Sequence, residues 1–402
     1  MINYTIDELM SRLGCEKFPE RWRTIYDDAK SMLENGENPL LFPEHYDALR
    51  EKYGVFENTL DYYKATAEFI SKNEELSLFF CLLCRALRDR GTIQSDIAKM
   101  DVPKAPEGAD TLPYDMITAL SLCQSYDDVY AAMKAHNVPA DILLESMKIP
   151  EKCVELNKKR SGRPRVHAFE WYQHAYDGKL YRIGRLQLEF PLTMLDWYKV
   201  FENENGEIIT LANIRVHRDG FALGARGYTD EEGSFAATIE ETENAYIGYP
   251  YDFYGHVGSE KVTLKKSEWR VKLKSGDLLV GLHIPANEPF GDEIIEKTIS
   301  DSREFMKNYY PEYEYKAFFC ASWLLDHTLI DLLGENANTA KFSARFTNFG
   351  VKSRGESPFN YVFKSSADVK IEDLPEETSL QRILKKHYLD GKAIYDIHGI
   401  FF

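Results

Sequence analysis

Two side chains in the second half of the chain could take part in catalysis. His283 lies in a strand-like apolar run, residues 278–284. Because histidine titrates near neutral pH, it could take a proton from an incoming ammonium group. The alternative is a core histidine that ties the strand to the next loop. Cys320, in the apolar run 315–323, would need a neighbouring base to carry an acyl group, and a small buried residue is the alternative. Asp326, just after this run, is expected to cap the helix that follows.

Tyrosines are concentrated between residues 246 and 255. Aromatic side chains with polar tips suit pockets for small ligands, so Tyr249, Tyr251 and Tyr254 could line a substrate pocket. A loop packed over the edge of a sheet would use the same residues for burial alone.

The cysteines do not suggest a disulfide framework, because only 6 are spread over 402 residues. Cys81 and Cys84 have the CxxC spacing, but they lie in the apolar run 79–84 and no second CxxC completes a zinc site. We interpret both as core residues and expect no metal. The sequence also lacks the Walker loop, the GxSxG elbow, the HExxH motif and the GxGxxG fingerprint. This argues against ATPases, α/β-hydrolases, zinc proteases and dehydrogenases.

The elements that must position these residues fall into two parts. In residues 1–157, apolar side chains recur at helical spacing, and no stretch alternates as a strand does. Residues 125–128 have a capping-box pattern that would open a helix. We predict an all-helical N-terminal domain over 1–157, with helices at 19–36, 76–87, 125–133 and 139–149.

Residues 158–164 are polar, contain Gly162 and Pro164, and are interpreted as a linker. After the linker, apolar residues alternate with polar ones as they do in strands. The C-terminal domain, 165–402, is therefore expected to hold a mixed β-sheet flanked by helices, and the whole chain to belong to the α+β class. Hairpin turns are expected at 205–206 and 275–276. Strands are predicted at 179–190, 197–201, 207–216, 269–273, 278–284, 315–323, 359–364 and near 394, with helices at 292–310, before 346 and at 378–388.

The net charge of −16 would repel phosphate backbones and anionic lipid surfaces. We therefore expect neither a nucleic-acid nor a membrane partner, and interpret the basic residues near the linker as a solvated surface. The N-terminus has no signal-peptide pattern, and the most apolar run, 76–87, is shorter than the roughly 20 residues that cross a bilayer. A cytoplasmic location is expected.

Several segments together resemble a known family. They are 180–187, 268–269, 276–277, 282–285, 319–326, 338–346 and 374–382, with a weaker match around 138–141. They are similar to bacterial acyltransferase-domain proteins that join an N-acyltransferase-type helical N-terminal domain to a GNAT-like C-terminal domain. The resemblance implies a GNAT-like fold and transfer of an acyl group from acyl-CoA, such as acetyl-CoA, to an amine of a small molecule or protein.

The resemblance also implies a place for acyl-CoA, because GNAT enzymes bind it where two central parallel strands separate. Here these strands would be 278–284 and 315–322. A backbone N–H near Leu282 would stabilise the oxyanion that forms when the amine attacks the thioester. His283 or a bound water would take the proton of that amine. The phosphate loop would be 285–291. The implied cofactor contacts are Leu282, Ile284, Ala286, Asn287, Phe290 and Gly291.

This loop departs from the GNAT pattern. It has one glycine, and Glu288, Asp292 and Glu293 lie where a pyrophosphate would bind. Acidic residues in a first turn stabilise a helix but repel a bound phosphate. The alternative to an N-acyltransferase is therefore a non-catalytic GNAT-like module that binds a ligand or a protein.

Overall fold

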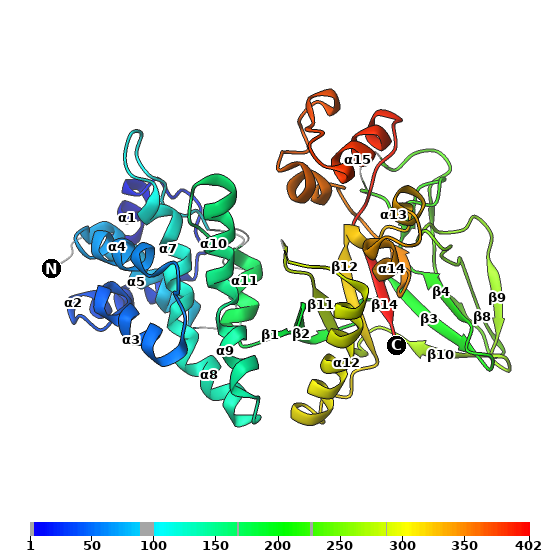
Figure 1. Cartoon of the computed structure of the whole chain (residues 1–402), viewed down its shortest axis with the longest axis horizontal. Helices are drawn as coiled ribbons and strands as arrows, with labels where there is room; N and C mark the ends of the chain where they lie inside the picture. The colour runs from blue at the N-terminus through cyan, green and yellow to red at the C-terminus, as the bar shows by residue number, and fades with distance from the viewer. Residues whose placement is uncertain (1–3, 89–99, 167–168, 226–227, 287) are drawn as a thin grey trace. The chain divides into compact units, whose positions relative to one another are not determined.

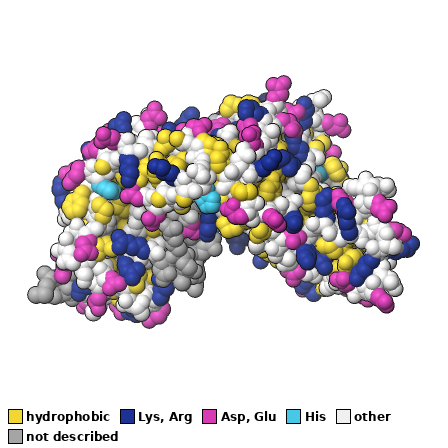
Figure 2. Space-filling view, turned by 90° about the horizontal axis from the view of Figure 1, so that it is seen from below, with side chains coloured by type: hydrophobic (Ala, Val, Ile, Leu, Met, Phe, Trp, Pro, Cys, Tyr) yellow, Lys and Arg dark blue, Asp and Glu magenta, His cyan; other side chains and the backbone are white. Residues whose placement is uncertain are grey.

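The computed structural model describes residues 4–88, 100–166, 169–225, 228–286 and 288–402. Its contacts divide the chain into two compact units, Met1–Arg182 and Ile183–Phe402. The first is helical, and the second contains a mixed β-sheet with helices (Figure 1), which confirms the predicted fold class. No helix in the described ranges combines the length and the hydropathy needed to cross a membrane. Acidic and basic side chains are interspersed on the face shown in Figure 2.

The first unit packs its helices around α5, whose side chains are buried along almost its whole length. α5 contacts α2, α4 and α7. Cys81 and Cys84 lie inside this helix and are fully buried, which confirms their assignment to the core, and burial raises the pKa of Cys81 to about 11. The helices are α1 (Ile6–Arg12), α2 (Trp22–Glu34), α3 (Pro43–Tyr53), α4 (Leu60–Ser71), α5 (Glu74–Leu87), α7 (Leu112–Leu122), α8 (Tyr126–Ala135), α9 (Ala140–Met147), α10 (Ile149–Ser161) and α11 (Phe169–Tyr176).

Two local predictions for this unit were wrong. The backbone of Ser125 is already helical, so its hydroxyl donates to the carbonyl of Leu122 at 3.2 Å and does not cap α8. The reason is that the 3-10 turn η2 (Cys123–Ser125) continues directly into α8. In addition, α10 extends over the first part of the predicted linker and ends at Gly162, whose φ of +74° suits a glycine C-cap.

The second unit is organised around a six-stranded sheet with the order β1-β2-β11-β12-β14-β13. β11 and β12 are parallel, with α12 between them in sequence, whereas β11 with β2, β12 with β14 and β13 with β14 are antiparallel. The elements are β1 (Leu180–Ile183), β2 (Leu186–Thr193), β11 (Leu278–His283), α12 (Asp292–Tyr309), β12 (Ala317–Ser322), α13 (Thr328–Leu333), α14 (Asn338–Ser343), β13 (Thr347–Gly350), α15 (Ser379–Leu389) and β14 (Ile397–Phe401).

Each face of this sheet has its own cover. Phe190 of β2 meets Phe305 of α12, with ring centroids 6.5 Å apart, so α12 lies on one face. On the other face, Tyr198 and Leu273 pack against Leu279 in a buried apolar cluster. These two residues belong to a three-stranded sheet, β10-β3-β4, formed by β3 (Tyr198–Asn203), β4 (Ile208–Ala212) and β10 (Trp269–Leu273).

The remaining strands are short and form small sheets of their own. β5 (Arg215–Val216) pairs with β6 (Phe235–Ala236). β8 (Ala245–Gly248) lies between β7 (Glu240–Glu241) and β9 (Val262–Lys265).

Four predictions for the sheets were wrong. The predicted strand 179–190 is two strands, because the chain turns at Gly184, where a Cβ atom would lie 2.7 Å from Oγ1 of Thr298. The turn at 275–276 does not close a hairpin, because β10 pairs with β3 while β11 pairs with β2. Residues Phe359–Phe363 form a π-helical turn against α15 and not a strand. The last strand begins at Ile397 rather than near 394. In addition, β13 was not predicted.

The boundary between the domains remains a prediction. The contacts place it after Arg182, later than the proposed linker, because α11 contacts α7 and α10. Phe169 and Tyr176 of α11 are 8% and 3% exposed. We therefore expect the piece 1–176 to melt at least about 5 °C higher than the piece 1–164, since two buried aromatic side chains contribute several kcal/mol.

Circular dichroism at increasing temperature on both pieces would measure this difference. Equal melting temperatures would show that α11 does not belong to the first unit. A β-rich spectrum from either piece would count against a helical N-terminal domain.

Candidate active site

The parallel strands β11 and β12 are paired over only three residues. The pairs are Leu279 with Ala317, Val280 with Phe318, and Gly281 with Phe319. Beyond this point, β11 stays paired with β2 as far as His283, and β12 stays paired with β14 as far as Ser322. The two strands therefore separate at their carboxyl ends while each remains fixed by its outer neighbour.

A carboxylate and an imidazole lie together beside this opening. Nε2 of His283 is 2.7 Å from Oε2 of Glu189, and the two side chains are 31% and 11% exposed. Glu189 is on β2, directly opposite Gly281, where a Cβ atom would lie 3.4 Å from the Cβ of Glu189. This distance is an ordinary van der Waals contact, so Glu189 lies directly against the backbone of β11. The pair is thus built from residues 94 positions apart in the sequence.

A second histidine lies on the same face, two strands away. His398 of β14 is paired with Ala321 of β12, and its ring centroid is 5.0 Å from that of Phe319 and 5.8 Å from that of Trp197. Burial lowers the pKa of His398 to about 4, so it is neutral at pH 7. Sequence reasoning missed Glu189 and His398. Strand alternation could have placed each on a defined face, but not beside the opening.

The loop after β11 is held by an arginine from the β1–β2 turn. Arg185 is 5% exposed and donates to the carbonyls of Pro289 and Pro285, each at 2.7 Å, and of Glu288 at 3.3 Å. Its guanidinium also lies over the ring of Phe290, 5.4 Å from the centroid. A single side chain therefore fixes the path of the loop that leads into α12.

The N-terminus of α12 is not capped by a side chain, because Gly291 occupies the N-cap position. Asp292, in the first turn, forms an ion pair with Arg345, and Nζ of Lys341 lies 3.5 Å from its carboxylate. Arg345 also binds Glu296 at 2.6 Å. The hydrogen bond from Arg345 lowers the pKa of Asp292. The repulsion expected from Asp292 in the sequence is thus offset by basic residues from α14 and the residues just after it.

The predicted cofactor residues surround the opening and the loop. Leu282 is 2% exposed on β11, Ile284 and Ala286 follow it, and the ring of Phe290 lies 5.1 Å from that of Phe342. Asn287 lies outside the described residues. Contacts of these residues with a cofactor remain a prediction.

Cys320 points to the same face of β12 as Phe318, away from the Glu189–His283 pair. It is 1% exposed, and burial raises its pKa to about 12. A thiol in this setting is neutral at pH 7, which favours the packing interpretation over that of a nucleophile.

The three predicted substrate tyrosines have different environments. The hydroxyl of Tyr251 donates to the carbonyl of Gly350 at 3.2 Å, and burial raises its pKa. Tyr249 packs on Phe235, with ring centroids 4.8 Å apart. Only Tyr254 of the three lines a cavity of about 250 Å³. This cavity lies at the ends of β13 and β14.

No group of three or more His, Cys, Asp or Glu side chains in the described ranges is placed to hold a metal ion.

The family model described as "GNAT-like C-terminal domain" matches residues 180–401, more than half of the chain, and the chain belongs to this family. No curated protein matches it.

Solved acyltransferase structures share the fold over the full length. An acyltransferase with CoA and 10C-teicoplanin has a TM-score of 0.62 and 15% identity, covering 98% of both chains. One with decanoyl-CoA and teicoplanin has a TM-score of 0.61 and 16% identity, again covering 98% of both. A mutant with octanoyl-CoA has a TM-score of 0.59 and 16% identity, covering 99% of both.

The ion pair at the start of α12 predicts how charge controls CoA binding. If the pyrophosphate binds at this helix N-terminus, Arg345→Gln should weaken CoA binding about threefold to fivefold, because Asp292 loses its main partner. Asp292→Asn in the same chain should restore most of the loss. Calorimetric titration of CoA would measure both effects, which should shrink at high salt.

Lys307→Gln provides a matched control, because it removes the same charge from the last turn of α12. It should leave CoA affinity unchanged. If Arg345→Gln and Lys307→Gln behave alike, the pyrophosphate does not bind at this helix N-terminus.

Proposed function

We propose that this protein transfers an acyl group from acyl-CoA to the amino group of an acceptor molecule. The observation that carries the proposal is the separation of β11 from β12 with the Glu189–His283 pair beside it. Membership of the GNAT-like family and the acyl-CoA complexes of acyltransferases with the same fold support it.

The acyl-CoA would enter between the separated strands. Its pyrophosphate would accept hydrogen bonds from the uncapped first turn of α12, helped by the helix dipole. In the loop after β11, Ile284, Ala286, Phe290 and Gly291 would contact the pantetheine arm. Beyond Gly281, β11 is no longer paired with β12, so a peptide N–H near Leu282 could donate to the thioester carbonyl.

His283 would accept the proton of the attacking amine. If Nε2–H donates to Glu189, the lone pair of the imidazole is on Nδ1, and the carboxylate stabilises the imidazolium that forms. The amine nitrogen bonds to the thioester carbon, the C–S bond breaks, and CoA leaves as a thiolate that is then protonated. This is direct transfer, so the proposal assigns no catalytic role to Cys320.

The second candidate function is a non-catalytic module that binds a small ligand. The cavity lined by Tyr254 favours it, because this cavity does not require acyl-CoA. A protein that binds CoA or small amines but releases no CoA thiol with any acyl donor would support this function instead.

The test is turnover with acetyl-, octanoyl- and decanoyl-CoA and a panel of amines, followed by thiol release. His283→Ala should lower kcat by roughly 100-fold to 10,000-fold, the range for loss of a general base. Its affinity for CoA should stay close to that of the wild type. Glu189→Gln should lower kcat less, because it keeps a hydrogen-bonding oxygen but removes the charge.

His136→Ala is a suitable control, because this histidine is exposed on the helical unit. It should keep the wild-type rate. If His283→Ala retains more than about half of the wild-type rate, His283 is not the general base of the reaction.

A further inference from the structure

The cavity of about 250 Å³ is lined by segments far apart in the sequence, all of them in the second unit. Gly255 and Gly350 of β13 both line it, and the Gly350 N–H donates to the Gly255 carbonyl at 2.8 Å. Glycine is needed at 255, because its φ is +82° and a Cβ atom there would lie 2.9 Å from the nitrogen of Gly350. A side chain at residue 255 would therefore disturb this part of the cavity wall.

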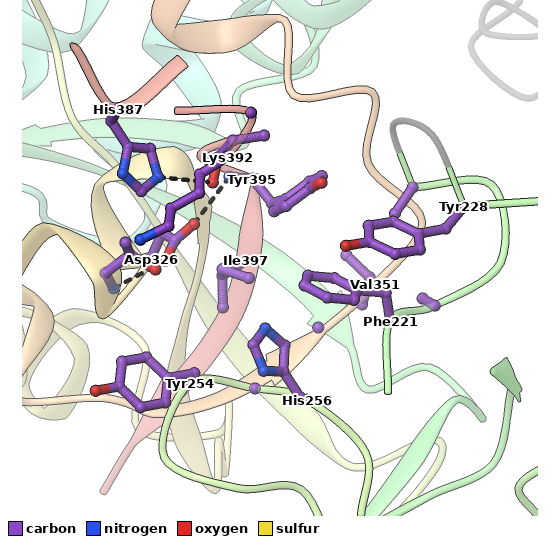
Figure 3. A pocket seen from close by; sticks show the side chains of 17 residues that line it. Phe221, Tyr228, Tyr254, His256, Asp326, Val351, His387, Lys392, Tyr395 and Ile397 are labelled. Carbon is purple, nitrogen blue, oxygen red and sulfur yellow. Dashed lines mark hydrogen bonds between the residues drawn. The ribbon is translucent and has the colours of Figure 1, made fainter. Parts of the chain in front are cut away.

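One end of the cavity is aromatic (Figure 3). The ring of Phe221 is stacked on Tyr228, with centroids 4.1 Å apart and planes inclined by 11°. His256 and Tyr395 complete this wall, with ring centroids 4.3 Å and 5.4 Å from that of Phe221. Faces of aromatic rings attract cations as well as apolar groups.

The other end carries a buried carboxylate. Asp326 is 4% exposed and lies near His387 and Lys392 in Figure 3. Its two oxygens accept the backbone N–H groups of Thr328 and Tyr395, each at 2.9 Å. The expectation that Asp326 caps the following helix was wrong, because His327 occupies the N-cap position of α13 and Asp326 bonds only the first N–H of the helix. The bond from Tyr395 ties the segment before β14 to the cavity wall.

No Lys or Arg nitrogen in the described part of the chain lies within 4.0 Å of the Asp326 carboxylate. Burial raises the pKa of Asp326 and lowers that of His387, so this histidine is neutral at pH 7. Lys392 is exposed to solvent. Burying a carboxylate is costly even when it accepts backbone hydrogen bonds, and a bound ammonium group would reduce that cost.

We propose that this cavity binds a small aryl-alkyl amine, with its ammonium group beside Asp326 and its ring against Phe221 and Tyr228. The two ends of the cavity match the two ends of such a ligand. An anionic ligand would instead have to lie beside the buried carboxylate, with only the exposed Lys392 to compensate. The proposal does not depend on acyl transfer, because binding here requires neither acyl-CoA nor His283.

The first experiment uses the wild-type chain and three probes of similar shape, measured by calorimetric titration without CoA. These are 2-phenylethylamine, 2-phenylethanol and 3-phenylpropanoate. The amine should bind at least about tenfold more tightly than either of the others. The proposal fails if the amine shows no binding at roughly 5 mM, or if the alcohol or the carboxylate binds as well as the amine.

Variants then locate the site. Asp326→Asn should abolish the preference for amine over alcohol, but it could also disturb the bonds to Thr328 and Tyr395. Phe221→Leu therefore provides a second test, and should weaken all three probes together. Lys392→Met should strengthen amine binding slightly, because a competing cation is removed, whereas it would weaken an anion.

Tyr246→Phe is the control, because Tyr246 lies in the same tyrosine-rich segment but packs on Phe201 and does not line the cavity. It should leave all affinities unchanged. Near-ultraviolet circular dichroism would show that each variant is folded. Unchanged amine affinity in folded Phe221→Leu and Asp326→Asn chains would overturn the proposal, whatever the outcome of the acyl-transfer assay.

Discussion

The candidate site in the second unit depends on the point in the sheet where the pairing of β11 and β12 ends. Inside a sheet, each strand normally satisfies the peptide groups on both of its edges, and a buried peptide group without a partner is costly. Here the outer edges stay paired, since β2 follows β11 to His283 and β14 follows β12 to Ser322. Beyond Gly281 and Phe319, β11 and β12 therefore remain paired on one edge each and face one another with unpaired inner edges. An extended ligand carrying amide groups could satisfy those inner peptide groups.

The charges around this opening come from distant parts of the chain. Judged by its own residues, the loop before α12 is acidic and poorly suited to a phosphate. Arg185 reaches it from the β1–β2 turn, and Arg345 reaches Asp292 from beyond α14. In a chain with a net charge of −16, a few basic side chains placed at one helix terminus determine the local field more than the total charge does.

Local patterns in the sequence were sufficient to predict the helical character of the first unit, the long helix α12, the mixed sheet and the placement of His283 on a central strand. They failed where tertiary contacts decide. Phe359–Phe363 has the aromatic and β-branched composition of a strand, yet it packs as a helical turn against Tyr388, with stacked rings 4.9 Å apart. β13 has only four residues and no clear alternation. The Glu189–His283 contact joins two strands whose register no single segment specifies.

The position of β14 has a consequence for how the chain is made. β14 contains residues 397–401, yet it lies between β12 and β13 rather than at an edge of the sheet. During synthesis, both neighbours leave the ribosome before the strand that joins them exists, and each presents an open hydrogen-bonding edge meanwhile. Tyr395 and Ile397, which line the cavity, arrive with the same segment. The pairing of β14 therefore completes the sheet and the cavity together, through contacts between residues that are distant in the sequence.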